Sequence, residues 1–168
     1  MSLRQRLVCD VSTGNLRQDP NNQAGADRIA ALGLSDPLGS ALWRLTDDLD
    51  PRAHPEVVKR LAARMRRSHD SWRTVLKVCD RAVWEYMNDR CPVCHGTAVR
   101  IRPNGITDAC KSCDATGLRR HTDAARARAT KLKPDECRKL AGRFDEAVAI
   151  LAEADAMTEK RVARKLGR

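Results

Sequence analysis

Two Cys-x-x-Cys pairs constrain this chain more than any other feature of its sequence. Cys91 and Cys94 form the first pair, Cys110 and Cys113 form the second, and 15 residues separate the inner cysteines. This spacing is typical of a structural zinc site. Each pair can turn two thiolates to one side, and two facing pairs supply four sulfurs at about 2.3 Å around a tetrahedral Zn²⁺. The sequence therefore predicts one zinc ion in an insert spanning residues 91–117; two disulfides or four free thiols are the alternatives.

The segment between the two pairs is predicted to be a short hairpin. It contains Pro103-Asn104-Gly105, a combination typical of tight turns. Gly96 and Gly117 follow the two pairs, where a chain that turns back beneath a metal needs positive φ angles.

A site closed by four sulfurs has no free coordination position for water or substrate, so the predicted metal is structural and not catalytic. His95 directly follows Cys94 and has poor reach to the same ion, so we expect a bystander or a donor to a ligand. The sequence also lacks an ordered Ser-His-Asp set, a phosphate-cradling glycine loop and a histidine-rich open site. We expect that the protein is not an enzyme.

The chain is strongly basic. Its 168 residues include 32 Lys and Arg against 22 Asp and Glu, a formal charge of +10. Such a balance favours a polyanionic partner, although a solvated cationic surface gives the same composition. Cys9, Cys79 and Cys137 are predicted to be free thiols in a reducing compartment. Apolar runs are too short to span a bilayer and no signal segment is visible, so we expect a soluble intracellular protein with no membrane partner.

The periodicity of apolar residues predicts a mainly α fold. Residues 1–34 show no sustained pattern and are predicted to be a flexible arm, whereas residues 35–168 are predicted to form a helical domain. The last predicted helix is long, with an acidic solvent side at Asp145, Glu146, Glu153 and Asp155. The predicted helices are Pro37–Leu49, Pro55–Arg67, Asp70–Met87, residues 122–132 and Pro134–Met157.

Two of these helices carry candidate contacts to a polyanion. In residues 122–132, Ala125, Ala129 and Leu132 are predicted to pack inward, which makes this the candidate recognition helix. Its predicted DNA contacts, with Arg128 nearer the boundary of the buried face, are Arg119, Arg120, Arg126, Arg128 and Lys131. The earlier helix offers candidate phosphate or polymerase contacts, for which a merely solvated face is the alternative, at Lys59, Arg60, Arg64, Arg66 and Arg67.

Several segments together resemble a known family. They are WEYMNDRC at the end of a helix, the knuckles CPVCHGT and CKSCDATG, ARARA in the following helix, and a long C-terminal helix. Over residues 55–160 the chain is similar to the late-gene antitermination proteins of lambdoid phages, the lambda-type Q proteins. It departs from their pattern at Ala98 and Ala115, where the knuckles usually have glycine.

The resemblance implies a transcription antitermination factor in the cytoplasm of a bacterial host. Such a factor binds double-stranded DNA at a phage late promoter and the host RNA polymerase with its sigma factor, and it suppresses pausing and termination. Nascent RNA is a further candidate partner. The resemblance also implies a helix-turn-helix-like DNA-binding domain, with residues 70–87 as supporting helix and residues 122–132 as recognition helix.

A different class of function also fits the charge. A zinc-knuckle RNA-binding or ribosome-associated protein would be equally basic, and it would carry stacking aromatic side chains on an open surface. Only Trp43, Trp72, Trp84, Tyr86 and Phe144 are available for this role, and several of them lie in the predicted core.

Overall fold

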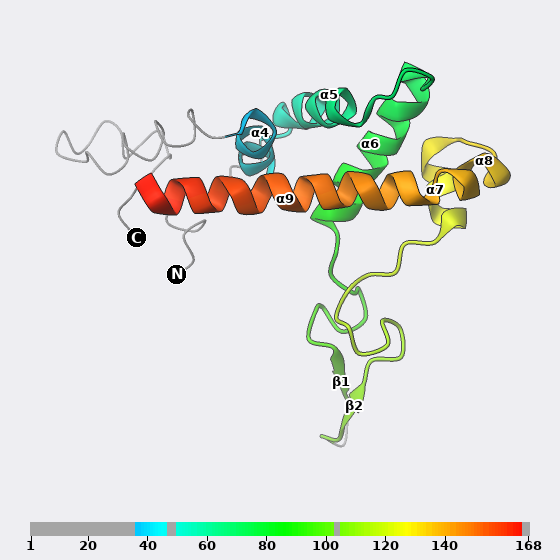
Figure 1. Ribbon diagram of the computed structural model, residues 1–168. Helices are drawn as coiled ribbons and strands as arrows, with labels where there is room; N and C mark the ends of the chain where they lie inside the picture. The colour runs from blue at the N-terminus through cyan, green and yellow to red at the C-terminus, as the bar shows by residue number, and fades with distance from the viewer. Residues whose placement is uncertain (1–35, 47–49, 103–104, 166–168) are drawn as a thin grey trace.

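A computed structural model describes residues 36–46, 50–102 and 105–165 of the chain (Figure 1). The predicted N-terminal arm, residues 1–34, lies outside these ranges. So do residues 47–49, which were predicted to end the first helix.

The described part is mainly helical, as the periodicity predicted. It contains six helices and one two-stranded hairpin. The helices are α4 (Pro37–Thr46), α5 (Ala53–Met65), α6 (Trp72–Met87), α7 (Asp123–Thr130), α8 (Pro134–Lys139) and α9 (Ala141–Lys165). The hairpin lies between α6 and α7 and consists of β1 (Val99–Ile101) and β2 (Thr107–Ala109).

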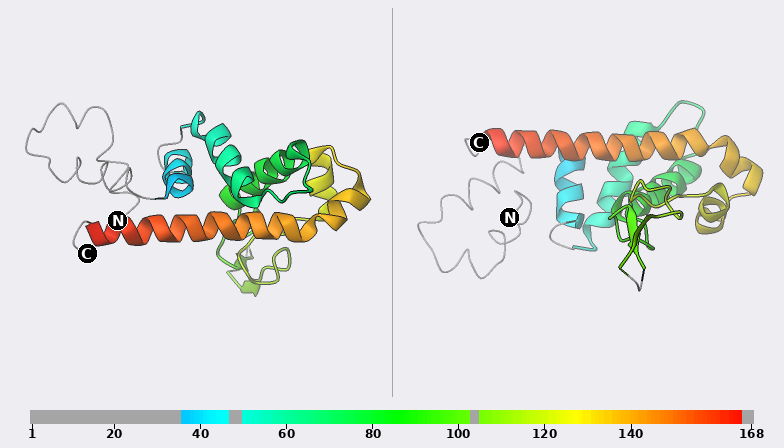
Figure 2. Two further views of the ribbon diagram at one scale, coloured as in Figure 1. Left: turned by 45° about the horizontal axis from the view of Figure 1, so that its top comes forward. Right: turned by 90° about the horizontal axis from the view of Figure 1, so that it is seen from below.

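Helix α9 is the longest element, and α4, α5 and α6 all pack against it (Figures 1 and 2). Phe144, Ala147, Leu151 and Ala154 recur at helical spacing and are fully buried or nearly so, because this face of α9 meets the other helices. The core also takes the apolar faces of the shorter helices, including Leu38, Leu42, Val57, Leu61, Val75, Cys79 and Val83.

Most of the predicted apolar faces are confirmed. Val57, Val58, Leu61 and Met65 are buried on α5, and Cys79 is buried on α6, where burial raises the pKa of its thiol to about 12. Trp72 and Met87 share the apolar spacing of α6, but both are exposed because they lie at the two ends of the helix.

The last predicted helix is divided in two. The backbone at Leu140 leaves helical geometry (φ −94°, ψ 3°), and Gly142, a poor helix former, follows within the next turn. The bend lets Cys137 face α7 while Phe144 enters the main core. At the other end α9 continues past the predicted Met157 to Lys165, and Thr158 and Val162 are buried.

The prediction that Asp155 faces solvent is wrong. Asp155 is buried, and its carboxylate accepts hydrogen bonds from Trp43 Nε1 at 2.6 Å and Tyr86 Oη at 2.5 Å. These bonds join α9 to α4 and α6, and they satisfy a charge that would be costly to bury alone.

No helix in the described ranges has an apolar stretch long enough to cross a bilayer.

Two helical glycines provide a matched test of this packing. A Cβ on Gly39 of α4 would lie 1.9 Å from Thr158 Oγ1 and 2.6 Å from the Ala154 carbonyl oxygen, whereas one on Gly142 would meet nothing within 4 Å. Gly39→Ala should lower the free energy of unfolding by about 2 kcal/mol or more, because it pushes α4 off α9. Gly142→Ala should raise it by up to about 1 kcal/mol. Chemical denaturation measures both; equal effects would contradict this close approach.

Candidate metal centre and its basic surroundings

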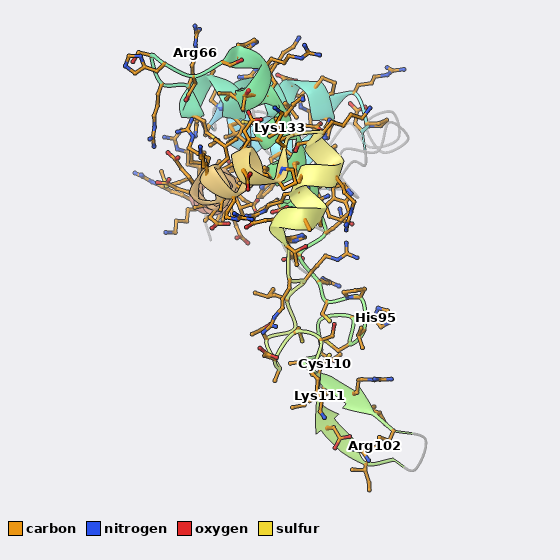
Figure 3. The ribbon with its side chains drawn as sticks, turned by 90° about the vertical axis from the view of Figure 1, so that its right-hand side faces the viewer. Arg66, His95, Arg102, Cys110, Lys111 and Lys133 are labelled. Carbon is orange, nitrogen blue, oxygen red and sulfur yellow. The ribbon has the colours of Figure 1, made fainter. Side chains whose placement is uncertain are left out.

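The hairpin and the two cysteine pairs form an arm that extends away from the helices (Figures 1 and 3). We call residues 89–119 the metal arm. Its two ends are joined at the base, where Cys91 N donates to the Gly117 carbonyl at 2.8 Å and Arg119 N donates to the Asp89 carbonyl at 2.5 Å. The chain thus leaves α6 and returns to α7 at one place, and we call this base, residues 89–91 and 117–119, the neck of the arm.

The four predicted metal ligands meet in one cluster. All four Sγ atoms lie within 4.8 Å of one another, with Cys91 to Cys110 at 4.0 Å and Cys94 to Cys113 at 3.7 Å. A tetrahedron of sulfurs around zinc has edges of about 3.8 Å, whereas a disulfide requires about 2.05 Å. All four cysteines are free and buried. The cluster could hold one metal ion, and the disulfide alternative does not fit.

The two halves of the cluster repeat one backbone conformation. After each pair a threonine, Thr97 or Thr116, donates both its backbone N–H and its hydroxyl to the carbonyl of the second cysteine. The two residues before each threonine have positive φ, as does the residue after it. In the second half the residue after the threonine must be glycine, since a Cβ on Gly117 would lie 2.6 Å from the Gly96 carbonyl oxygen.

Both departures from the glycine pattern adopt this same conformation. Ala98 has φ 65° and Ala115 has φ 58°, values that cost a residue with a Cβ about 1–2 kcal/mol. The arm therefore keeps the geometry of the knuckles and bears local strain. His95 is exposed and is not part of the cluster, although its φ of 51° belongs to the turn.

The protein surroundings shift the pKa values of the cluster thiols in different directions. The backbone N–H of Cys94, against the opposing effect of burial, lowers the pKa of the Cys91 thiol to about 6. Burial raises the pKa of the Cys110 thiol to about 11. A bound metal would hold the cysteines as thiolates, so metal binding must release protons and weaken as the pH falls.

Metal content tests the cluster directly. We expect one metal ion per chain, lost when Cys110 or Cys113 is changed to Ser, because the four cysteines are the only buried side chains in the described part of the metal arm. Elemental analysis measures the metal, and limited proteolysis should show cleavage in the arm alone. His95→Ala is the control and should keep the metal; loss of metal in this variant would contradict the four-cysteine assignment.

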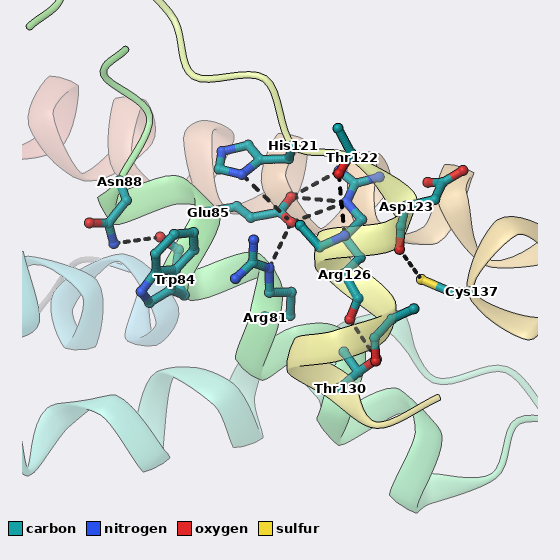
Figure 4. A network of polar contacts seen from close by, with 12 residues as sticks. Arg81, Trp84, Glu85, Asn88, His121, Thr122, Asp123, Arg126, Thr130 and Cys137 are labelled. Atoms are coloured by element: carbon teal, nitrogen blue, oxygen red, sulfur yellow. Dashed lines mark hydrogen bonds and ion pairs between the residues drawn. The ribbon is translucent and has the colours of Figure 1, made fainter. Parts of the chain in front are cut away.

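The structure corrects the predicted role of Arg126. This side chain, expected to project from the recognition helix, is only 8% exposed and binds the buried Glu85 of α6 (Figure 4). Arg126 donates from Nε and one terminal nitrogen to Glu85 at 2.9–3.2 Å, and it reaches Asp145 of α9 at 2.9 Å. Its guanidinium also lies 4.7 Å from the centre of the Phe144 ring. Arg126 therefore joins α6, α7 and α9 and is unavailable to DNA.

The inward face of α7 differs from the prediction as a consequence. Arg126, Ala127 and Thr130 are buried, whereas Ala129 is exposed and Leu132 is only half-buried beyond the end of the helix. As a charged residue, Glu85 would be expected on the solvent side of α6. The signal that could have corrected this is its spacing, since Glu85 lies three residues after Ala82 and seven after Val78, both buried.

A second contact that the sequence did not reveal fixes the neck of the metal arm. Trp84 of α6 has the guanidinium groups of Arg81 and Arg119 over its ring at 4.1 and 5.2 Å. His121 meets the same ring edge-on at 6.0 Å, and burial lowers the pKa of this histidine. Trp84 thus holds the returning strand of the arm against α6.

The remaining predicted DNA contacts are on the surface. Arg120 pairs with Asp114 at the second knuckle, and Arg119 covers Trp84. Arg128 and Lys131 are exposed, and within the described ranges neither has an ion-pair partner. Lys131 ends α7 in a left-handed conformation, with φ 55°.

The candidate contacts on α5 and just beyond its end are largely engaged within the protein. Arg60 pairs with Glu56, Arg64 pairs with Asp36, and Arg67 pairs with Glu146 of α9. Arg66 lies over the ring of Trp72 at 5.7 Å, while Lys59 is exposed. Exposed pairs of this kind stabilise weakly, so the set remains basic surface, but its side chains are oriented by acidic partners.

In comparisons with known proteins, no protein-family model matches the chain, and no curated protein matches it.

Alanine substitutions at two arginines of α7 distinguish a side chain that stabilises the fold from one that only lies on the surface. Arg126→Ala leaves Glu85 buried with less compensation, so it should lower the free energy of unfolding by about 3 kcal/mol. Arg128→Ala, on the exposed side of the same helix, should change it by less than about 0.5 kcal/mol. Thermal and chemical denaturation of the metal-loaded proteins measure the difference. Similar small losses in both variants would show that the Glu85–Arg126 pair does not hold α7 in place.

Proposed function

We propose that this protein is a phage-type transcription antitermination factor that binds promoter DNA and bacterial RNA polymerase with its sigma factor. One observation carries the proposal: a buried four-cysteine cluster on an arm between two helices, in a chain with a net charge of +10. The resemblance of both knuckles and their flanking helices to lambda-type Q proteins supports this function. Nascent RNA is a further candidate partner.

Zinc is the metal we assign to the cluster. Four thiolates in a tetrahedral arrangement suit Zn²⁺, and the set offers no open position for catalysis. Residues Cys91, Cys94, Cys110 and Cys113 would hold the ion, which would supply the buried centre that the metal arm otherwise lacks.

The DNA-binding face would include the exposed side of α7. Arg128 and Lys131 are available there, and Arg119 and Arg120 lie at the adjacent neck of the metal arm. In a helix-turn-helix-like arrangement α6 would support α7 from behind through the Glu85–Arg126 pair, and α7 would enter the major groove. Arg126 would orient the helix, and Arg128 would be the candidate for base contacts.

The RNA-binding alternative also has a specific observation in its favour. Trp72 and Trp84 are both exposed, as stacking on unpaired bases requires. Arginines already lie over both rings, however, and an incoming base would have to displace them. We therefore favour duplex DNA.

Salt titrations of binding to specific and random DNA duplexes test the proposal. Arg128→Ala should lower the ratio of specific to random affinity about fivefold to a hundredfold, the effect of losing a base contact worth about 1–3 kcal/mol. Arg64→Ala combined with Arg67→Ala should leave this ratio nearly unchanged and reduce the salt dependence for both duplexes. Read-through of a terminator by purified polymerase is the functional measurement.

Three outcomes would contradict the proposal in different ways. If the Arg64 and Arg67 variant controls specificity, the recognition element lies on α5. Tighter binding to single-stranded RNA than to any duplex would favour the RNA-binding class. Absence of terminator read-through, with DNA binding intact, would remove the antitermination role.

A further inference from the structure

Trp84 lies in the last turn of α6, where the chain returns from the metal arm to α7 (Figure 4). Its side chain is 39% exposed and lies outside the apolar core. Three side chains nevertheless meet its ring: the guanidinium groups of Arg81 and Arg119, at 4.1 and 5.2 Å, and His121 edge-on at 6.0 Å. Contacts of both kinds are attractive, so the ring holds the chain that carries Arg119 and His121.

Residues 118–122, which we call the returning segment, lead directly into α7. Arg119 and His121 reach α6, whereas Leu118 is exposed and Arg120 pairs with Asp114 of the second knuckle. Thr122 comes directly after His121 and caps α7, since its hydroxyl accepts from a backbone N–H of the first turn at 3.2 Å. The position of His121 therefore determines where α7 begins.

Helix α7 has little apolar packing of its own. It is eight residues long, below the about 12–15 residues that an isolated helix needs to be even marginally stable. Ala127 is its one residue in the described apolar core. Arg126 is held by Glu85, which also accepts from Arg81 at 2.9 Å and lies 3.9 Å from Nδ1 of His121. The side chains around the tryptophan ring are thus the same ones that surround the anchor of α7.

The returning segment follows directly from the metal cluster. Gly117 N lies within hydrogen-bonding distance of Cys113 Sγ, at 3.3 Å, and the Gly117 carbonyl accepts from Cys91 N at 2.8 Å. Because Cys91 and Cys113 are both candidate ligands, a bound metal would fix the position of Gly117. Arg119 follows two residues later, and its backbone N–H donates to the Asp89 carbonyl. The metal would therefore fix the beginning of the returning segment, and Trp84 fixes its end.

We propose that Trp84 is a positioning residue that transmits the metal state of the arm to α7. A loaded arm presents Arg119 and His121 to the ring, and the ring keeps them beside the anchor of α7. Loss of the metal releases the returning segment, so α7 stays helical but becomes more mobile. The consequence for DNA rests on the proposed function: specific binding through α7 depends on the metal, although the four cysteines lie outside the proposed DNA-binding face.

Trp72 provides a matched control for this role. Its side chain is 41% exposed, close to the value for Trp84, and it also has a guanidinium over its ring, that of Arg66 at 5.7 Å. Arg66 directly follows α5 and is not connected to the metal arm. The two tryptophans therefore share exposure and a cation, and they differ in their contact with the returning segment.

Three substitutions separate the ring from its surroundings. Trp84→Leu removes the ring and keeps a strong helix former. Trp84→Phe keeps an aromatic face that a guanidinium can cover. Trp72→Leu is the control. All are prepared as full-length, metal-loaded protein, with metal content and thermal stability measured first. If Trp84→Leu does not fold, Arg119→Met removes the same contact from the other side, and its hydrogen exchange is measured instead.

Hydrogen exchange of the α7 amides, followed by mass spectrometry, measures the coupling without DNA. Metal removal should speed this exchange about tenfold in the unmodified protein, as expected when two or three contacts of this kind are lost. Trp84→Leu should exchange about tenfold faster while still metal-loaded, and metal removal should then add less than about twofold. Trp84→Phe should restore most of the protection. Trp72→Leu should match the unmodified protein in both states.

Binding to specific and random DNA duplexes measures the consequence. Metal-loaded Trp84→Leu should lower the ratio of specific to random affinity about threefold to tenfold, because α7 is held less firmly. Its affinity for the random duplex should change less than about twofold, because the substitution removes no charge.

Several outcomes would overturn the inference. They are full protection of α7 in metal-loaded Trp84→Leu, an equal loss of protection in Trp72→Leu, or α7 exchange in the unmodified protein that does not respond to the metal. Weaker binding of Trp84→Leu to single-stranded RNA, with α7 protection intact, would assign the ring to base stacking and would also overturn it. If the unmodified protein does not distinguish the two duplexes, the proposed function fails, and hydrogen exchange alone decides whether Trp84 couples the arm to α7.

Discussion

The buried pair between Glu85 and Arg126 is the interaction on which the arrangement of this protein depends. Arg126 lies at 8% exposure and Glu85 at 2%, and although Arg81 also donates to Glu85 at 2.9 Å, loss of Arg126 would leave this buried carboxylate with less compensation. The pair joins α6 to α7 across the 35 residues between these helices that include the metal arm, and Asp145 extends it to α9. The orientation of α7, and with it the placement of Arg128 and Lys131, follows from satisfying these buried charges.

The helical body and the metal arm are stabilised by different means. Apolar side chains on one face of each helix pack around α9, and Asp155 joins three helices by hydrogen bonds. The described part of the arm has no apolar core, and four sulfurs with repeated backbone turns define it instead. Removal of the metal should therefore affect the arm first, because the body gains little from contacts with it. Trp84 is the link through which the state of the arm reaches α6.

The basic residues divide into three groups with different physical roles. Arg126 and Arg143 are mostly buried and act within the protein; Arg143 donates to the last carbonyl of α5, that of Met65, and to Asp70. Arg60 and Arg64 of α5, and Arg67 just beyond its end, are paired with acids on the surface. Arg128 and Lys131 are exposed and remain for a partner. A net charge of +10 alone could not distinguish these groups, and the proposed DNA contacts depend on the distinction.

Local information in the sequence determined much of this protein. Spacing of the cysteines predicted the four-cysteine cluster, since such a cluster is built from short turns, and apolar periodicity predicted the helices of the body, since each buries one face. Tertiary structure decided the rest. Arg126, Glu85 and Asp155 are charged, so their residue type predicts exposure, and only the partners supplied by distant helices make their burial possible. The break at Leu140 likewise depends on two separate packing surfaces, which no local pattern records.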